Sequence, residues 1–318
     1  MNTPVLHQIS LQGPAQAGDE TRLLPLHGEQ VWTHLDALSP EAGDWLREHS
    51  ELNDIAIEGL LAEETRPRLV VRQQRLLLIL RGVNLNPGAE PDDMVSVRIW
   101  TDGNCLISAQ RRPLQSTTDI VDRLTQGEGP ETVPNLVLAW VDQLVNRMND
   151  TIGNLEDQVL QLEERTLDND TDGLRHEFAK LRKQTVVLRR YLAPQRETLF
   201  RLANEAPVWL EELQRLKLRE TAERLARHID AIEEVRDRAA LAQEELMSQL
   251  SEEMNARMYL LSIVAALFLP LGFFTGLLGV NVGGMPGTEN DQAFWIVVGI
   301  CVTCLAILGV IFRNKKWV

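Results

Sequence analysis

The sequence MYLLSIVAALFLPLGFFTGLLGV, residues 258–280, decides the fold because it contains no charged side chain. As an α-helix it would be about 35 Å long, enough to cross the hydrocarbon layer of a bilayer. A second apolar run, AFWIVVGICVTCLAILGVIF at 293–312, would be about 30 Å long. A helix of a soluble protein has no need to be apolar on every side over this length. The sequence therefore predicts two membrane-spanning helices.

The charges that flank these runs predict their orientation. Basic residues stand at the outer ends of the two runs, at Arg257, Arg313, Lys315 and Lys316. The segment between the runs, 281–292, contains Glu289 and Asp291 and neither Lys nor Arg. Because basic flanks stay on the cytoplasmic side, both termini are expected in the cytoplasm and the connecting loop outside. The tail, 313–318, then returns to the cytoplasm.

The composition excludes several classes of function. The net charge of −14 argues against a nucleic-acid-binding protein, which needs a basic face. Only three cysteines occur, so no disulfide framework is expected. HEFAK at 176–180 begins like the HExxH motif of metalloproteases but ends in Lys, and no GxxxxGK[ST] motif is present. We therefore expect neither an enzyme nor a bound cofactor.

Short runs rich in Val, Ile and Leu predict strands in the first third of the chain, because Gly, Pro, Asn and Asp separate them. These runs are VLHQISL, VWTHL, RLVVR, RLLLILRGV, MVSVRIW and CLISAQ. Two further stretches, SPEAGDWLREHS and ELNDIAIEGLLAEE, have helical patterns. Residues 1–130 are therefore predicted to form a cytoplasmic α/β domain with helices packed on a sheet.

From about Thr132 the pattern is helical almost to the end of the chain. Breaks are predicted at NDTDG (169–173), at Pro194 and at Pro207. This gives a cytoplasmic helical region at 131–206.

Residues 207–257 are predicted to form a stalk helix that continues into the first span. Neither Gly nor Pro occurs between Pro207 and Pro270, so one helix about 90 Å long is possible. Its apolar stripe recurs at steps of three and four, at Leu225, Ile229, Ile232, Val235, Ala239, Ala242, Leu246, Leu250 and Met254. Such a stripe must pack on other helices or on copies of itself. These features predict an α+β protein whose cytoplasmic domain is joined to the membrane by one helix.

One face of the first span is small or mildly polar and carries no charge. Counted back from the loop at the same spacing, it consists of Gly276, Gly272, Leu269, Ala265, Ser262, Met258 and Asn255. Two spans cannot enclose an aqueous path, and burying a bare ion costs on the order of tens of kcal/mol. A pore would therefore need several chains in a ring. The stretch also contains GFFTG, a GxxxG motif for which close helix packing is the simpler interpretation.

The C-terminal combination of PLGFFTGLLGVN, a short loop, a second span and the basic tail RNKKWV resembles the CorA-type family of divalent metal transporters. That family carries Gly-Met-Asn at the outer end of the first span, and this chain has Gly279, Val280 and Asn281 there. Val in place of Met, followed by GGMPG, is similar to the zinc-transporting branch, ZntB. ETRPRLV (64–70) and RRYLAPQR (189–196) also resemble that branch.

The resemblance implies a homopentamer in the cell inner membrane, with the first spans lining a pore and the second spans forming an outer ring. It places Asn281 at the outer mouth and Asn255 near the cytoplasmic end. Met258, Leu261 and Leu269 correspond to hydrophobic positions of the pore. The expected partners are the lipid bilayer, divalent cations and protons.

Several of these residues have a second interpretation. Glu289 and Asp291 could concentrate cations at the outer mouth, or they could simply be solvated in a loop. Asn281 could be a helix C-cap. In the family arrangement, an inner basic collar is formed by Arg313, Lys315 and Lys316. Alternatively, these residues act only as the charges that set the orientation of the spans.

No tight metal site is predicted. The first span contains no His, Cys, Asp or Glu, which are the usual zinc ligands. Gly272 stands where magnesium-transporting relatives can carry a hydroxyl residue, a departure in the middle of the pore. Cys301 and Cys304 lie one turn apart in the second span without a second pair of ligands, so we interpret them as small apolar residues. The six histidines lie outside the spans, and their spacing matches no zinc site.

The expected function is Zn²⁺ uptake coupled to protons, with Zn²⁺ as the transported substrate. Zinc and proton coupling are both implied by the resemblance, and the residues themselves fix no direction of transport. The alternatives are a magnesium or cobalt channel of the same family, zinc efflux, and a two-span membrane sensor that moves no ion.

Overall fold

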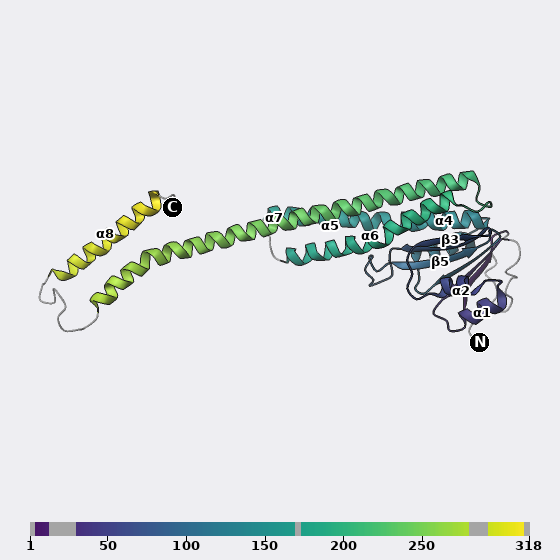
Figure 1. Ribbon diagram of the computed structural model, residues 1–318, viewed down its shortest axis with the longest axis horizontal. Helices are drawn as coiled ribbons and strands as arrows, with labels where there is room; N and C mark the ends of the chain where they lie inside the picture. The colour runs from purple at the N-terminus through teal and green to yellow at the C-terminus, as the bar shows by residue number, and fades with distance from the viewer. Residues whose placement is uncertain (1–3, 13–29, 169–172, 280–291, 315–318) are drawn as a thin grey trace. The chain divides into compact units, whose positions relative to one another are not determined.

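The fold was examined in a computed structural model, which describes residues 4–12, 30–168, 173–279 and 292–314 (Figure 1). The chain divides into two units, Met1–Gln243 and Glu244–Val318. The first unit contains a sheet and helices, and the second contains the apolar part of one long helix and a further apolar helix.

The six predicted runs form one six-stranded sheet, which confirms the predicted strands. Its elements are β1 Val5–Ser10, β2 Val31–Asp36, β3 Arg68–Arg72, β4 Arg75–Gly82, β5 Val95–Thr101 and β6 Cys105–Gln110. The spatial order is β1-β2-β6-β5-β4-β3. All neighbours are antiparallel except β2 and β6, which pair in parallel, from Val31 opposite Cys105 to Asp36 opposite Gln110.

Helices cover both faces of the sheet. α1 Ala42–His49 and α2 Asp54–Leu61 bury an apolar cluster on one face, where Leu60 packs with Leu77 and Trp100. The side chain of Asn53 accepts a hydrogen bond from the Ala56 N–H group and so caps α2. On the other face lies α4 Val133–Asn146, whose Trp140 ring is 5.1 Å from that of Trp32.

The remaining helices are α3 Gln115–Thr125, α5 Met148–Leu167, α6 Leu174–Asn204, α7 Glu212–Leu278 and α8 Ala293–Asn314. The helical region begins where it was predicted, because Thr132 accepts a hydrogen bond from the Asn135 N–H group at the start of α4. α3 was not predicted from the sequence. Around the predicted break at 169–173, α5 ends at Leu167 and α6 begins at Leu174.

The predicted break at Pro194 is wrong, because Pro194 lies inside the continuous helix α6. Proline removes one helical hydrogen bond, but the residues around it are held by packing. Leu192 and Leu199 are buried. Gln195 donates to the Arg81 carbonyl over 3.0 Å and accepts from the Arg81 N–H group over 2.6 Å. This pairing satisfies the backbone N–H and carbonyl groups of Arg81 in β4, at a position beyond the β3 pairing. It also holds α6 against β4 next to Pro194.

α7 is one helix from Glu212 to Leu278, as the continuous apolar stripe predicted. It begins at Glu212 rather than at Pro207, because Pro207 accepts a turn hydrogen bond from Leu210 before the helix starts. The predicted stripe is buried at Leu225, Ile229 and Ile232 and at Val235, Ala239 and Leu246. The stripe becomes exposed as it approaches the first apolar run, and Met254 is 62% exposed.

Candidate cation pathway

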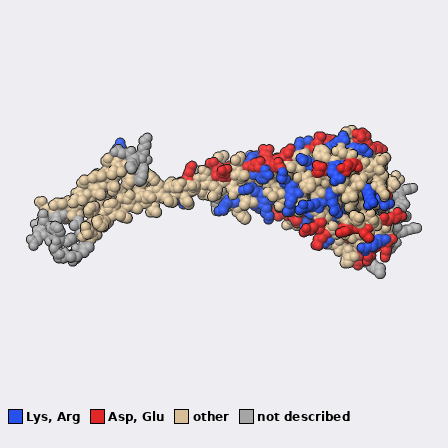
Figure 2. Space-filling view, viewed as in Figure 1, with Lys and Arg blue, Asp and Glu red and all other residues tan. Residues whose placement is uncertain are grey.

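The apolar end of α7 and the whole of α8 are each long and apolar enough to cross a membrane. Figure 2 shows them as a surface almost free of the basic and acidic side chains that cover the first unit. Pro270 does not interrupt α7, and the helix ends at Leu278. α8 runs to Asn314, slightly beyond the apolar run from which it was predicted.

The predicted pore-lining residues lie on a surface of α7 that the single chain leaves uncovered. Met258, Leu261 and Leu269 are 61%, 69% and 74% exposed. The other predicted positions are exposed as well: Asn255, Ser262, Ala265, Gly272 and Gly276. The partly buried residues of the same stretch are Ile263, Ala266, Leu267, Pro270 and Leu271. At 3.6 residues per turn, these two sets fall on different sides of the helix.

The exposed face offers few groups that could hold a bare ion. The Ser262 hydroxyl donates to the Met258 carbonyl over 2.8 Å, and the Thr275 hydroxyl donates to the Leu271 carbonyl over 2.9 Å. Both hydroxyls thus use their proton within the helix. No atom lies within 4 Å of a Cβ built at Gly272 or Gly276. The two glycines therefore leave this face open between its larger apolar side chains.

The helix ends at the predicted selectivity motif. Gly279 donates its N–H group to the Thr275 carbonyl over 2.9 Å and closes the last turn of α7. The rest of the motif, Val280 and Asn281, lies outside the described residues, as do Glu289 and Asp291 of the loop. Of the predicted basic collar, Arg313 is exposed in the last turn of α8. Lys315 and Lys316 lie outside the described ranges.

α8 has an apolar stripe of its own. Phe312 is buried, and the partly buried residues along the helix are Val297, Val298, Cys301, Cys304 and Leu308. Cys301 and Cys304 are free thiols within this stripe. Their interpretation as small packing residues stays a prediction.

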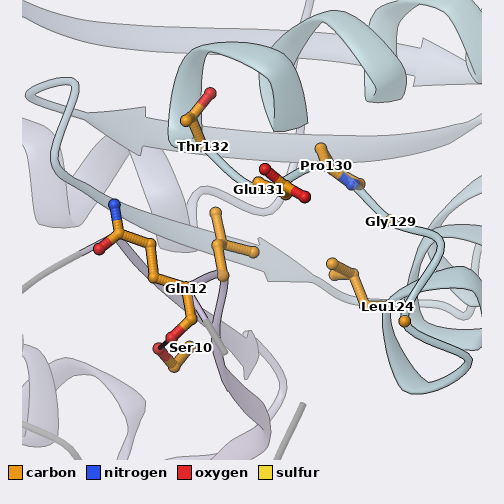
Figure 3. Close-up of a pocket in the computed structure, with 9 residues that line it drawn as sticks. Ser10, Gln12, Leu124, Gly129, Pro130, Glu131 and Thr132 are labelled. Atoms are coloured by element: carbon orange, nitrogen blue, oxygen red, sulfur yellow. Dashed lines mark hydrogen bonds between the residues drawn. The ribbon is translucent and has the colours of Figure 1, made fainter. Parts of the chain in front are cut away.

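No group of three or more His, Cys, Asp or Glu residues that could hold a metal ion occurs in the described part of the chain. A cavity of about 490 Å³ lies in the first unit, where Gln12 and Ser10 face Glu131 and Thr132 (Figure 3). Among the described lining residues, Glu131 is the only carboxylate. One carboxylate with hydroxyl and amide neighbours falls short of a tight zinc site.

Two histidines of the first unit, His34 and His7, belong to an aromatic packing cluster. His34 is fully buried and its Nδ1 lies 2.7 Å from the Ser108 hydroxyl, which also accepts from the Trp32 indole N–H group. Its ring stacks on that of His7 at 6.1 Å. Burial lowers the pKa of His34 to about 4. Burial in this cluster therefore favours the neutral form of the ring.

The contacts that hold the first part of α7 could not be predicted from the sequence. Arg224 pairs with Asp142 of α4, and Arg238 pairs with Glu163 of α5. Glu233 of α7 pairs with Arg189 of α6. The partners are 44 to 82 residues apart, so no local spacing rule finds them. Together they attach α7 to α4, α5 and α6, the three helices that directly precede it.

Comparison with known proteins identifies the family to which this chain belongs. The sequence model of the family described as CorA-like Mg²⁺ transporter protein matches residues 28–315. The chain belongs to this family. The predicted family is thus confirmed, and the match runs from just before β2 to the end of α8.

Relatives within the CorA-like family carry two different names. The chain is 40% identical over 297 residues to the divalent cation transporter CmaX of Pseudomonas aeruginosa, covering 91% of this chain and 88% of that protein. It is 34% identical over 291 residues to the zinc transport protein ZntB of Yersinia enterocolitica, again covering 91% and 88%. The predicted likeness to ZntB is therefore found, together with a higher identity to CmaX.

Solved structures agree with this CorA-like fold. The full-length CmaX structure superposes with a TM-score of 0.84 at 36% identity and covers 98% of each chain. The complete structure of the CorA magnesium transporter from Methanocaldococcus jannaschii superposes with a TM-score of 0.83 and covers each chain fully. At 18% identity, this second likeness shows the fold alone.

Proposed function

We propose that this chain is a zinc transporter that carries Zn²⁺ through a pore formed by a homopentamer in the inner membrane. One observation carries the proposal. The face of α7 with Ser262, Ala265 and Gly272 is exposed and free of charge, while another side of the helix is partly buried between Ile263 and Leu271. Two helices cannot enclose water, so such a face needs copies of itself to form a path. The names of the relatives, a divalent cation transporter and a zinc transport protein, support cations as the substrate.

In this proposal both termini are cytoplasmic and the segment 281–292 lies outside. Asn281 forms an outer ring of amide oxygens, which accept hydrogen bonds from the water around the ion. Neutral oxygens bind weakly enough to release the ion again, as conduction requires. Glu289 and Asp291 raise the local concentration of cations at this mouth. The inner collar is formed by Arg313, Lys315 and Lys316.

Transport in this proposal follows electrochemical gradients. A membrane potential that is negative inside favours entry of a divalent cation by about 4.6 kcal/mol per 100 mV. Zinc uptake is coupled to protons, which move with the water of the hydrated path, since the span from Met258 to Gly279 contains no carboxylate or histidine. A magnesium channel is the second candidate, because the family model is described by Mg²⁺.

The test is reconstitution of the full chain in liposomes, with entry of Zn²⁺, Mg²⁺ and H⁺ followed by separate dyes. We expect Zn²⁺ entry together with H⁺. Asn281→Ala should slow Zn²⁺ entry roughly tenfold. A factor of this size corresponds to the loss of about one hydrogen bond between the protein and the hydrated ion. Asn290→Ala removes an amide from the same segment and should leave the rate unchanged.

Each other outcome points to a different conclusion. Entry of Mg²⁺ without Zn²⁺ would place the protein with the magnesium channels. Absence of any metal entry would favour the non-transporting sensor. Equal rates for Asn281→Ala and the unmodified chain would remove the proposed role of that amide.

A further inference from the structure

A second cavity of the first unit lies between the first turn of α2 and the hairpin that joins β3 to β4. Its volume is about 360 Å³, within the range of about 300–1,000 Å³ that is usual for small-molecule sites. Its lining includes Ile55 from α2 and Val70, Leu77 and Trp100 from the sheet. It is independent of the proposed cation pathway.

Part of the wall of this cavity consists of exposed apolar side chains. Ile55 is 68% exposed and Val70 is 45% exposed. Leu77 and Trp100 belong to the buried cluster beneath them and form the base. An exposed apolar patch next to a cavity is a recurrent feature of binding sites.

Two arginines at the rim give the cavity a positive charge. Arg72 and Arg75 line it and are directly opposite each other in the β3–β4 pairing. Like charges in this position destabilise a hairpin. Neither guanidinium has an ion pair within the described part of the chain, although Arg75 lies 6.0 Å from the centre of the Trp100 ring. An anion bound between them would remove the repulsion.

The turn between these arginines is strained. Gln73 and Gln74 have positive φ angles of 49° and 68°. Two-residue hairpins of this kind normally use Asn-Gly, because a side chain with a Cβ is disfavoured in the left-handed region. Strain of this type persists where the surrounding structure holds it, and it is concentrated at functional sites.

The same turn holds the segment that leads into α7. The Gln74 side chain accepts a hydrogen bond from the Val208 N–H group over 2.6 Å, and its carbonyl accepts from the Trp209 indole N–H group over 2.7 Å. The Trp209 ring lies against Gly103, where a Cβ would be 2.5 Å from the ring. Gln73 lines the cavity, and Gln74 is hydrogen-bonded to Val208 and Trp209, just before α7 begins. A ligand that fixes the turn therefore also fixes the start of α7.

We propose that this cavity binds a small organic carboxylate with an apolar body, and that the bound ligand tightens the contact between the Gln73–Gln74 turn and the start of α7. The apolar body lies on Trp100 and Leu77, next to Ile55. The carboxylate lies between Arg72 and Arg75, where each guanidinium donates hydrogen bonds to it.

The test uses the full chain in lipid nanodiscs and two matched probes, 3-phenylpropionate and its uncharged amide. Isothermal titration should show saturable binding of the carboxylate, and binding of the amide should be at least tenfold weaker. The double variant R72A/R75A should weaken carboxylate binding by at least tenfold. Arg66→Ala removes an exposed arginine that does not line the cavity and should leave binding unchanged.

The second readout is hydrogen exchange at residues 205–215. Adding 3-phenylpropionate should slow exchange there in the unmodified chain and have no effect in R72A/R75A. Equal binding of acid and amide, equal loss in Arg66→Ala, or an absence of saturable binding would overturn the proposal. So would a change in oligomer size in R72A/R75A without probe binding to the unmodified chain, because the cavity would then be an interface between copies.

Discussion

The two parts of α7 share one helix but differ in what covers them. Between Glu212 and Gln243 the apolar stripe is buried within the chain, and three ion pairs attach the helix to α4, α5 and α6. Between Met258 and Leu278 the apolar side chains are largely exposed, and no Asp, Glu, Lys or Arg is present. The first part is complete in one chain, whereas the second part is stable only in contact with lipid or with other chains.

This difference shows why one continuous helix is useful. Its first part is fixed to a folded unit by burial, which is insensitive to the membrane. Its second part has a free face that remains available for assembly. The helical backbone is continuous from the first part to the second, and it continues through Pro270, Gly272 and Gly276.

The largest expected effect tests whether burial stabilises the first part of α7 but not the second. Leu225→Ala removes a fully buried side chain of α7 and should lower the free energy of unfolding of the first unit by about 2–5 kcal/mol. Leu269→Ala makes the same change at a residue that is 74% exposed in the same helix. It should change that free energy by less than about 0.5 kcal/mol. Urea denaturation followed by circular dichroism measures both, and equal losses would contradict the comparison.

An acid-dependent loss of stability should come from the first unit alone. The pKa of His34 is lowered by burial from 6.5 to about 4, so the unfolded chain binds its proton first. The free energy of unfolding is therefore constant above about pH 6.5 and falls as the pH decreases from 6.5 to 4. A pKa difference of this size corresponds to about 3 kcal/mol.

Denaturation at pH 7 and pH 5 tests this expectation. His34→Gln should remove most of the pH dependence, and its neighbour His7 should contribute a smaller part of the same sign, because burial also lowers its pKa. His176→Gln changes an exposed histidine and serves as the control. An unchanged acid sensitivity in His34→Gln would show that other groups carry it.

Local patterns in the sequence were enough to predict much of this fold. The strands follow from their runs of Val, Ile and Leu, and the start of α4 follows from the helical pattern that begins at about Thr132. α7 follows from its long stripe without Gly or Pro. α3 was missed because QSTTDIVDRLT is short and rich in β-branched residues, and Leu114 offers no capping side chain.

What the sequence could not predict depends on contacts between distant residues. The parallel pairing of β2 with β6 joins segments about 75 residues apart. The continuity of α6 at Pro194 depends on Gln195 meeting Arg81 across the fold. For the candidate site, the uncovered face of α7 follows from the 3.6-residue period. The positions of Val280, Asn281 and the acidic loop residues stay predictions.

The smallest expected effect concerns the ion pairs that attach α7. Arg238 and Glu163 are hydrogen-bonded, and each side chain is about 30% exposed, so solvent weakens their attraction. A double-mutant cycle with Arg238→Ala and Glu163→Ala should give a coupling energy of about 0.2–1 kcal/mol, decreasing with added salt. The exposed pair Arg257–Glu253, in the part of α7 near the membrane run, serves as the matched control and should give less. If the two couplings are equal, burial alone distinguishes the two parts of the helix, and the ion pairs add nothing specific to its first part.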